Sequence, residues 1–373
     1  MKKLLPEICN VQYGYAFDSA KFSVYQGTPL IRIRDVVRGF SETYTTEVCD
    51  QEYIVNDGDI LIGMDGEFNI ARWKGGKAYL NQRVCRLLPK EEVDAMYLYY
   101  FMPQALKAIE DKTPFVTVKH LSAKELNKIV VTVPTIEEQK KIANCLQRLD
   151  ELISLRKQQL SKLDELVKSR FIELFGNSEY PSEPLDNNVI EMFIGPFGSS
   201  LKNECFVDEE DGFCMVYEQK HAIQKTMNVP TRYVPKSKYE ELKRFAVVGG
   251  DIIVSCRGTI GEIFIVPEDA PMGIMHPSIM KIRLDTTKYN QKFFVFALEQ
   301  YMDEHNAEAK GSGVKMAVSA TVLGQSDFVL PPIEIQNQFA AFVKQTDKSK
   351  LAIQQSLEKL EMLKKALMQK YFG

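Results

Sequence analysis

Residues 133–176 read VPTIEEQKKIANCLQRLDELISLRKQQLSKLDELVKSRFIELFG, and residues 330–373 read LPPIEIQNQFAAFVKQTDKSKLAIQQSLEKLEMLKKALMQKYFG. The two segments align without a gap at a constant offset of 197 residues, which places Pro134 opposite Pro331. Each segment follows a longer stretch of comparable length. Self-similarity of this kind indicates a tandem duplication of a whole unit, which fixes the architecture before any single element is assigned.

Apolar residues in both segments recur in alternating steps of four and three residues, the spacing of a coiled-coil seam. We therefore expect two long helices that pack on one another. Arg156 and Arg170 interrupt the seam of the first helix, and Lys350 and Lys364 interrupt that of the second. The expected interface residues are Ile142, Leu146, Leu149, Ile153, Leu160, Leu163 and Val167 in the first helix, and Val343, Ile353, Leu357, Leu360 and Leu367 in the second.

Start and stop signals frame the first helix. Thr135 and Glu138 have the spacing of a capping box, and Gly176 is expected to end the helix in the left-handed conformation. The second copy lacks the capping box. A helix of this length extends about 50 to 60 Å at 1.5 Å per residue.

The stretches before the helices correspond more weakly, as short strands and turns of a mixed α+β fold. Amphipathic helices are expected at residues 97–109 and 291–302. Strand candidates in equivalent places are residues 58–66 and 80–89 in the first copy, and 250–258 and 275–284 in the second. The expected domains are residues 1–133 and 177–330 as two α/β globular domains, and residues 134–176 and 331–373 as the two helices of an antiparallel coiled coil with a pseudo-two-fold internal repeat.

Composition indicates a folded protein of the cytoplasmic type. Of 373 residues, 45% are hydrophobic and 26% are charged, close to the globular average. No secretion signal or membrane-spanning run is expected, because Pro6 and Glu7 end the first apolar run early. The seven cysteines form no C-x-x-C pair and are expected to be reduced and mostly buried.

Catalytic signatures are missing from the sequence. It contains no phosphate-binding loop and no G-x-S-x-G, and none of its four histidines lies at metal-binding spacing from another. We expect no catalytic residues, no metal and no cofactor in this chain. Two alternatives stay open, a methyltransferase-type enzyme and a coiled-coil scaffold protein without DNA readout. The net charge of −3 gives no sign of a polyanionic partner by itself.

Polar side chains next to the predicted strands are the candidates for function. Arginine pairs with guanine and asparagine or glutamine with adenine, so such side chains are suited to reading base edges. The candidate DNA-binding residues are Arg32, Arg34, Asp65, Asn69, Arg72, Asn81, Gln82, Arg83 and Lys119 in the first copy, and Ser199, Ser200, Lys202, Lys220, Arg257, Thr259, His276 and Lys315 in the second.

These motifs together resemble the specificity subunit of type I restriction-modification systems. The resemblance is carried by GYAFDSAKF, LIRIRDV, GDILIGMDG, LNQRVCRL and VPTIEEQKKIANCLQRLDELI, and again by IGPFGSSL, GDIIVSCRG, HPSIMKIRL and LPPIEIQNQ. The P-x-I-E-x-Q helix start after each globular stretch is its most specific element. The chain departs from the pattern at Gln338 and Phe339 and at the loop GSGVKMAVS.

The resemblance implies two target recognition domains, each reading one half of a bipartite, asymmetric sequence in double-stranded DNA. The helices would set the spacing and dock two modification (methyltransferase) subunits. It further implies restriction subunits with translocase and nuclease activity, and it places S-adenosylmethionine and ATP in the partner subunits only. No membrane partner is implied.

Overall fold

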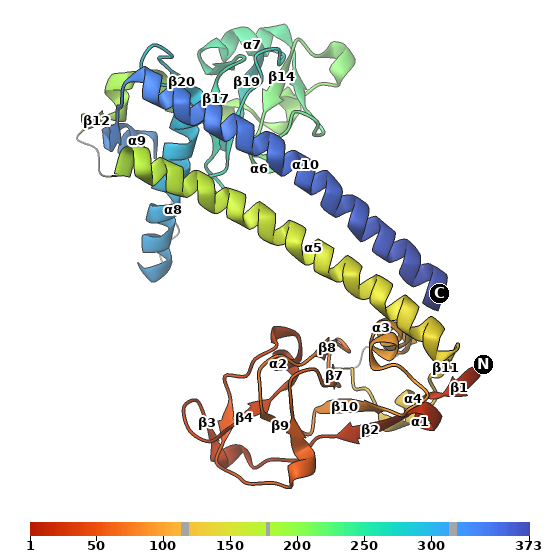
Figure 1. Cartoon of the computed structure of the whole chain (residues 1–373). Helices are drawn as coiled ribbons and strands as arrows, with labels where there is room; N and C mark the ends of the chain where they lie inside the picture. Colours follow the sequence, from red (N-terminus) through yellow and green to blue (C-terminus); the bar gives the residue numbers. More distant parts are fainter. Residues whose placement is uncertain (113–118, 177–179, 313–318) are drawn as a thin grey trace. The chain divides into compact units, whose positions relative to one another are not determined.

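The computed structural model describes residues 1–112, 119–176, 180–312 and 319–373 (Figure 1). The chain divides into two compact units, residues 1–159 with 353–373 (unit 1) and residues 160–352 (unit 2). Two long helices, α5 (Ile136–Phe171) and α10 (Ile333–Phe372), therefore contribute to both units. No helix in the described ranges combines the length and apolar character needed to cross a membrane.

Unit 1 contains two sheets and a short ribbon. A four-stranded antiparallel sheet has the order β2-β10-β7-β8, and a five-stranded sheet has the order β3-β5-β4-β9-β6, in which β4 and β9 are parallel. Its other elements are β1 (Lys2–Leu4), α1 (Leu5–Ile8), β2 (Cys9–Tyr13), β3 (Phe22–Ser23), β4 (Thr28–Ile31), α2 (Ile33–Arg38), β5 (Tyr44–Thr45), β6 (Ile54–Val55), β7 (Ile60–Gly63), β8 (Ile70–Arg72), β9 (Ala78–Leu80), β10 (Val84–Pro89), α3 (Ala95–Lys112), α4 (Ala123–Leu126) and β11 (Val130–Thr132).

Unit 2 repeats this plan. Its four-stranded sheets have the orders β13-β20-β17-β18 and β15-β14-β19-β16, and β14 and β19 are parallel. Its elements are β12 (Ser182–Pro184), β13 (Val189–Ile194), β14 (Cys214–Tyr217), α6 (Gln219–Gln224), β15 (Tyr233–Val234), α7 (Lys236–Glu241), β16 (Ala246–Val247), β17 (Ile252–Ser255), β18 (Ile263–Ile265), β19 (Gly273–Met275), β20 (Ile279–Leu284), α8 (Gln291–Ser312), α9 (Ala320–Gln325) and β21 (Asp327–Val329).

The Gly-Asp pair before β7 and β17 has the same structural role in both units. Gly58 and Gly250 adopt positive φ values of 94° and 81°, which a glycine tolerates without steric cost. The following aspartates accept a backbone N–H bond three residues back and pair with an arginine of the neighbouring strand, Asp59 with Arg86 and Asp251 with Arg283. The Gly-Asp motif therefore forms a turn that an ion pair ties to the neighbouring strand.

The predicted strand at residues 80–89 is broken in the structure. β9 ends at Leu80, residues 81–83 form a turn, and β10 begins at Val84 in the other sheet. The same break separates β19 from β20. Gly176 does not adopt the predicted left-handed conformation, because α5 ends in a π-helical turn, Ile172–Gly176, instead. All seven cysteines are free, and Cys9, Cys85, Cys214 and Cys256 are buried.

Within each unit the two long helices run antiparallel. In unit 1, Arg156 donates from Nε to Ser356 Oγ at 3.2 Å, and Lys157 pairs with Glu361 at 3.2 Å. Leu146 and Leu149 pack there in a cluster that includes Leu360 and Leu367. The other expected interface residues of unit 1, which are Ile142, Ile153, Ile353 and Leu357, are buried or half-buried.

In unit 2, Lys350 pairs with Asp164, and Val167 lies in the hydrophobic core that includes Phe339 and Val343. Leu160 and Leu163 are half-buried. The capping box at the start of α5 is present, since Glu138 N–H donates to Thr135 Oγ1 and Thr135 N–H donates to Glu138 Oε2.

Candidate nucleic-acid interface

In unit 1, the candidate residues gather where strands of both sheets end. The parallel strands β4 and β9 end at the same edge of their sheet. β7 ends next to them, since a Cβ at Gly63 would lie 3.1 Å from Cγ2 of Ile33, which follows β4. Arg32 and Arg34 follow β4, Asp65 follows β7, and the turn 81–83 follows β9.

Asp65 organises the charges at this edge. Its carboxylate lies 2.6 Å from His120 Nδ1 and 3.6 Å from Arg83 Nε, and Arg83 lies 3.4 Å from the same His120 nitrogen. The Arg83 side chain remains 53% exposed. Its guanidinium is therefore oriented by an acid and still presents donors to solvent, the arrangement needed for bidentate recognition of a guanine edge.

The neighbouring candidates differ in their exposure and in the hydrogen bonds they already make. Gln82 is exposed, and Asn81 is half-buried with its Oδ1 accepting from Gln82 N–H. Asn69 is half-buried in the β7–β8 turn, and its carbonyl accepts from Gly63 N–H. Arg34 is exposed, donates to Thr43 Oγ1 at 3.3 Å and lies 3.7 Å from Asp35. Lys119 is half-buried and donates to the Glu110 carbonyl at 2.8 Å.

Arg72 does not belong to this edge. It pairs with Ile60 at the start of β7, whereas Asn69 and Asp65 lie near the end of that strand. Arg72 instead lines a hollow of about 700 Å³ with Arg38, Lys74 and residues of α3 and α5. The structure therefore separates this arginine from the other candidates of unit 1.

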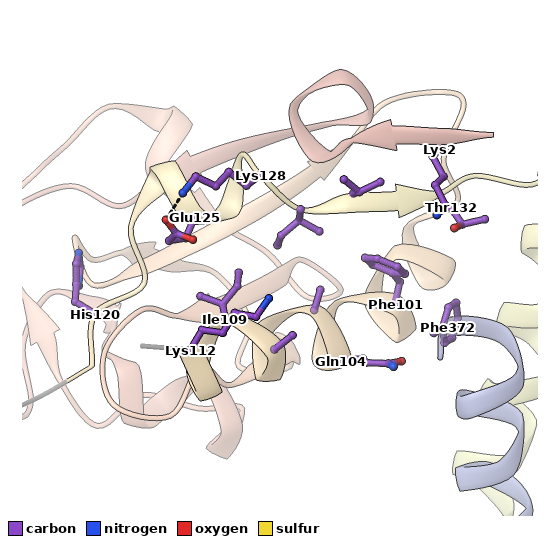
Figure 2. Close-up of a pocket in the computed structure, with 14 residues that line it drawn as sticks. Lys2, Phe101, Gln104, Ile109, Lys112, His120, Glu125, Lys128, Thr132 and Phe372 are labelled. Carbon is purple, nitrogen blue, oxygen red and sulfur yellow. Dashed lines mark hydrogen bonds and ion pairs between the residues drawn. The ribbon is translucent and has the colours of Figure 1, made fainter. Parts of the chain in front are cut away.

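His120 also lines a groove of about 810 Å³ in unit 1 (Figure 2). Phe101 and Ile109 of α3 contribute apolar surface, Lys2 and Lys112 contribute positive charge, and the Phe101 and Phe372 rings lie 6.0 Å apart. In the corresponding place of unit 2, the Tyr301 ring packs 5.3 Å from Phe328. The two units thus differ in the side chains at this groove.

Unit 2 has a different set of side chains at the corresponding edge. Glu218 follows β14, is 8% exposed and pairs with Arg232 and with Lys220, the latter at 2.7 Å. Burial opposes ionisation of Glu218, but the hydrogen bonds from Arg232 and Lys220 outweigh it and lower the pKa of the carboxyl. Glu218 is thus a charged acceptor, the group that suits the amino group of cytosine.

His276 follows β19 in this edge and is half-buried. Its Nδ1 lies 2.7 Å from Ser278 Oγ. Desolvation lowers the pKa of His276, and the nearby cations add to that effect while Glu218 opposes it. The imidazole is therefore favoured in its neutral form, which offers one donor and one acceptor.

The remaining candidates of unit 2 lie on loops. Arg257 and Thr259 are exposed after β17, Ser199 and Lys202 are exposed after β13, and Ser200 is half-buried. Lys315 lies outside the described residues. Among the described side chains, no group of three could hold a metal ion.

Three residues at these edges were missed by sequence reasoning. Tyr15 bridges to Asn81, Arg232 stacks 3.9 Å over the Phe206 ring, and Phe197 is 87% exposed in a hollow that Arg257 and Pro277 also line. For Phe197 a signal was present, because an aromatic residue between Pro196 and Gly198 stands where turns usually place polar residues.

Similarity to known protein families agrees with this architecture. The model of the type I restriction modification DNA specificity domain matches residues 1–165 and 212–362. The chain therefore belongs to this family.

Curated relatives carry related names. The EcoBI specificity subunit of Escherichia coli is 36% identical over 166 residues, covering 44% of this chain and 35% of that protein, so this match spans only about a third of the relative. The MjaVIII specificity subunit of Methanocaldococcus jannaschii is 22% identical over 370 residues, 91% of this chain and 87% of that protein.

Solved structures share the fold. The S subunit of a type I restriction-modification system from M. genitalium aligns with a TM-score of 0.59 at 16% identity, covering all of this chain and 96% of that one. A chain from a structure describing assembly of the type I R-M system aligns with a TM-score of 0.61 at 15% identity, again over the whole of this chain and 97% of the other.

Proposed function

We propose that this chain is the DNA specificity subunit of a type I restriction-modification complex, and that each unit reads one half of a bipartite target. The observation that supports this most is the pair of strand-end clusters at equivalent edges of two duplicated units. Cluster 1 comprises Arg32, Asp65, Asn81, Gln82 and Arg83, and cluster 2 comprises Glu218, Lys220, Arg232, Arg257 and His276.

The clusters differ in chemistry, which predicts unlike half-sites. Cluster 1 offers an exposed arginine and amides, which suit purine edges, whereas cluster 2 centres on a buried, ionised glutamate and a neutral histidine. An asymmetric target follows from this difference.

The proposal also includes the partners. Two modification subunits would dock on the helices and carry S-adenosylmethionine, and restriction subunits would use ATP. Such a division of labour accounts for the net charge of −3, because phosphate contacts dominate DNA affinity and the partners would supply many of them. A cytoplasmic location fits this role.

The test is to map methylated bases by single-molecule sequencing in cells that carry the chain with its modification subunit. Gln82→Ala with Arg83→Ala is expected to change one half of the methylated motif, and His276→Asn the other half. Arg72→Ala is the matched control, since this exposed arginine lies at the opposite end of its sheet.

Two results would overturn the proposal. One is methylation without a bipartite motif, and the other is a motif that neither cluster variant alters while Arg72→Ala does. Binding of S-adenosylmethionine to the isolated chain would instead favour the methyltransferase alternative.

A further inference from the structure

The loop after β13 presents an aromatic side chain to solvent. Phe197 is 87% exposed, although burying a phenylalanine side chain is usually favourable. Its neighbours in the chain are Pro196 and Gly198, and Gly198 has no side chain to cover the ring. A single exposed apolar side chain is common on protein surfaces, so the surroundings of the ring decide whether it belongs to a binding surface.

Local geometry holds this loop against His276 of cluster 2. Gly195 N–H donates to the Ile279 carbonyl at 2.9 Å, and a Cβ at Gly195 would lie only 2.3 Å from the His276 carbonyl oxygen. Pro196 is buried, and Ser200 N–H donates to the Phe197 carbonyl at 2.8 Å. The ring is therefore presented on a constrained turn, which lowers the entropy lost on binding.

Positive charge surrounds the ring. Phe197 lines a hollow of about 420 Å³ together with Phe193, Arg244, Arg257 and Pro277, and none of its lining residues is acidic. Both arginines are exposed, and neither forms an ion pair with any acid in the described part of the chain. Arg244 lies 5.6 Å over the Phe193 ring, so its charge stays free of an acidic partner, and an apolar tip flanked by two such guanidinium groups matches a base step flanked by phosphates.

The corresponding loop of unit 1 lacks this feature. Gly14 corresponds to Gly195, since a Cβ at Gly14 would collide with the Asn81 carbonyl just as one at Gly195 would with that of His276. Ala16 then stands where unit 2 has Phe197, and Phe17 is buried. At the position of Phe197, unit 1 therefore has no ring, although Tyr15 next to Gly14 is 38% exposed.

From these observations we infer that Phe197 is a DNA-contacting residue that enters the duplex as an apolar wedge at one base step of the half-site read by unit 2, with Arg244 and Arg257 on the flanking phosphates. This inference rests on the proposed function and deepens it. Inserted phenylalanines unstack a base step and select for steps that deform easily, so Phe197 adds specificity without a hydrogen bond to a base.

The experiment uses the full chain with its modification subunits and a duplex that carries the mapped motif. 2-Aminopurine replaces each adenine of both half-sites in turn, because it pairs with thymine as adenine does and its fluorescence rises when it is unstacked. For the unaltered complex, we expect emission to rise at one step of the second half-site.

Phe197→Ala is expected to abolish this rise and to weaken binding about ten-fold, within the range for loss of aromatic stacking on a base. Phe197→Tyr is expected to keep the rise. Ile190→Ala is the matched control, because Ile190 is 63% exposed on the same strand β13 but lies at its other end. Arg244→Ala and Arg257→Ala are expected to weaken binding and to reduce its salt dependence.

The two proposals fail differently. If the unaltered complex shows no sequence preference, both fall. If it binds its motif but Phe197→Ala retains both the fluorescence rise and the affinity, only the wedge is overturned. If Phe197→Ala releases the modification subunits instead, the ring is a protein contact and the wedge is likewise overturned.

Discussion

A buried glutamine explains why P-x-I-E-x-Q marks both helix starts. Gln336 Oε1 accepts from Asn290 N–H at 2.9 Å, and its Nε2 donates to the Lys288 and Pro331 carbonyls. Gln139 makes the same three bonds in unit 1, to the N–H of Asp94 and to the carbonyls of Glu92 and Pro134. The side chain thus ties the start of each long helix to the loop that begins α3 or α8.

Replacing this glutamine is expected to destabilise its unit. Gln336→Ala leaves one N–H and two carbonyls without their partner in a buried site, at a cost of about 1 to 3 kcal/mol for each group that water cannot reach. Urea unfolding of the full chain should show an earlier transition. Gln338→Ala, on the exposed face two residues later, should change stability by less than about 0.5 kcal/mol. Equal midpoints would contradict this role.

His276 is expected to make unit 2 sensitive to acid. Desolvation lowers the pKa of His276 in the folded state below its ordinary value of 6.5, and Arg232, Arg257 and Lys220 add to this while Glu218 opposes it. The unfolded state then binds a proton more readily, so stability is full above pH 6.5 and falls as the pH drops below it.

The measurement is hydrogen exchange of β20, corrected for intrinsic rates, between pH 7.5 and 5.5. His276→Asn, which copies Asn81 of unit 1, should reduce the loss of protection at low pH. Some dependence should remain, because burial also lowers the pKa of His221. An unchanged profile would show that His276 is not responsible.

At the scale of the elements, charged residues in the seam pair across the two helices. Lys364 binds Asp150, whose other oxygen accepts from Tyr100 Oη at 2.8 Å. Lys364→Glu would place two carboxylates together, and we expect a loss of about 1 kcal/mol that shrinks at high salt. Urea unfolding at two salt concentrations measures this. Lys365→Glu, at the exposed neighbouring position, is the control. An equal loss of stability in Lys365→Glu would contradict a specific Lys364–Asp150 pair.

Much of the element plan could be predicted from sequence, because heptads and the duplicated offset are local patterns. These patterns predicted the two long helices. Local patterns also predicted the strands after Gly58 and Gly250 and the helices that the structure shows as α3 and α8. The break at residues 81–83 did not, because β9 and β10 belong to different sheets and that partition is a tertiary property. The end of α5 was predicted wrongly, since one glycine cannot specify a left-handed cap over a π-helical turn.

The candidate site could be predicted only in part for the same reason. Residues after strand ends were recognisable as polar loops, and Asp65 and Arg83 do meet. Arg72 looked equivalent in the sequence but lies at the other end of β7, which only strand pairing decides. Phe197 was missed because hydrogen-bonding capacity guided the search and an apolar wedge has none.

At the scale of the whole molecule, the duplication means that each unit includes part of the long helix that belongs to the other copy of the repeat. In unit 1, Tyr100, Leu146 and Leu149 pack with Leu360 and Leu367 of α10, among others. A fragment of residues 1–176 lacks α10 and would expose these side chains. The α5 helix of a second copy of this fragment resembles the missing α10, with Leu163 in place of Leu360.

Two such fragments are therefore expected to pair weakly through antiparallel α5 helices. The weakness follows from Arg170, which the repeat places where Leu367 packs, so a guanidinium would replace a leucine twice in each pair. Arg170→Leu should tighten the dimer by roughly ten-fold or more, since burying one leucine contributes about 1.5 to 3 kcal/mol. Sedimentation velocity over a concentration series measures the change. Lys168→Leu, on the exposed face of α5, should have no effect, and a fragment that stays monomeric with leucine at position 170 would show that α10 is not interchangeable with α5.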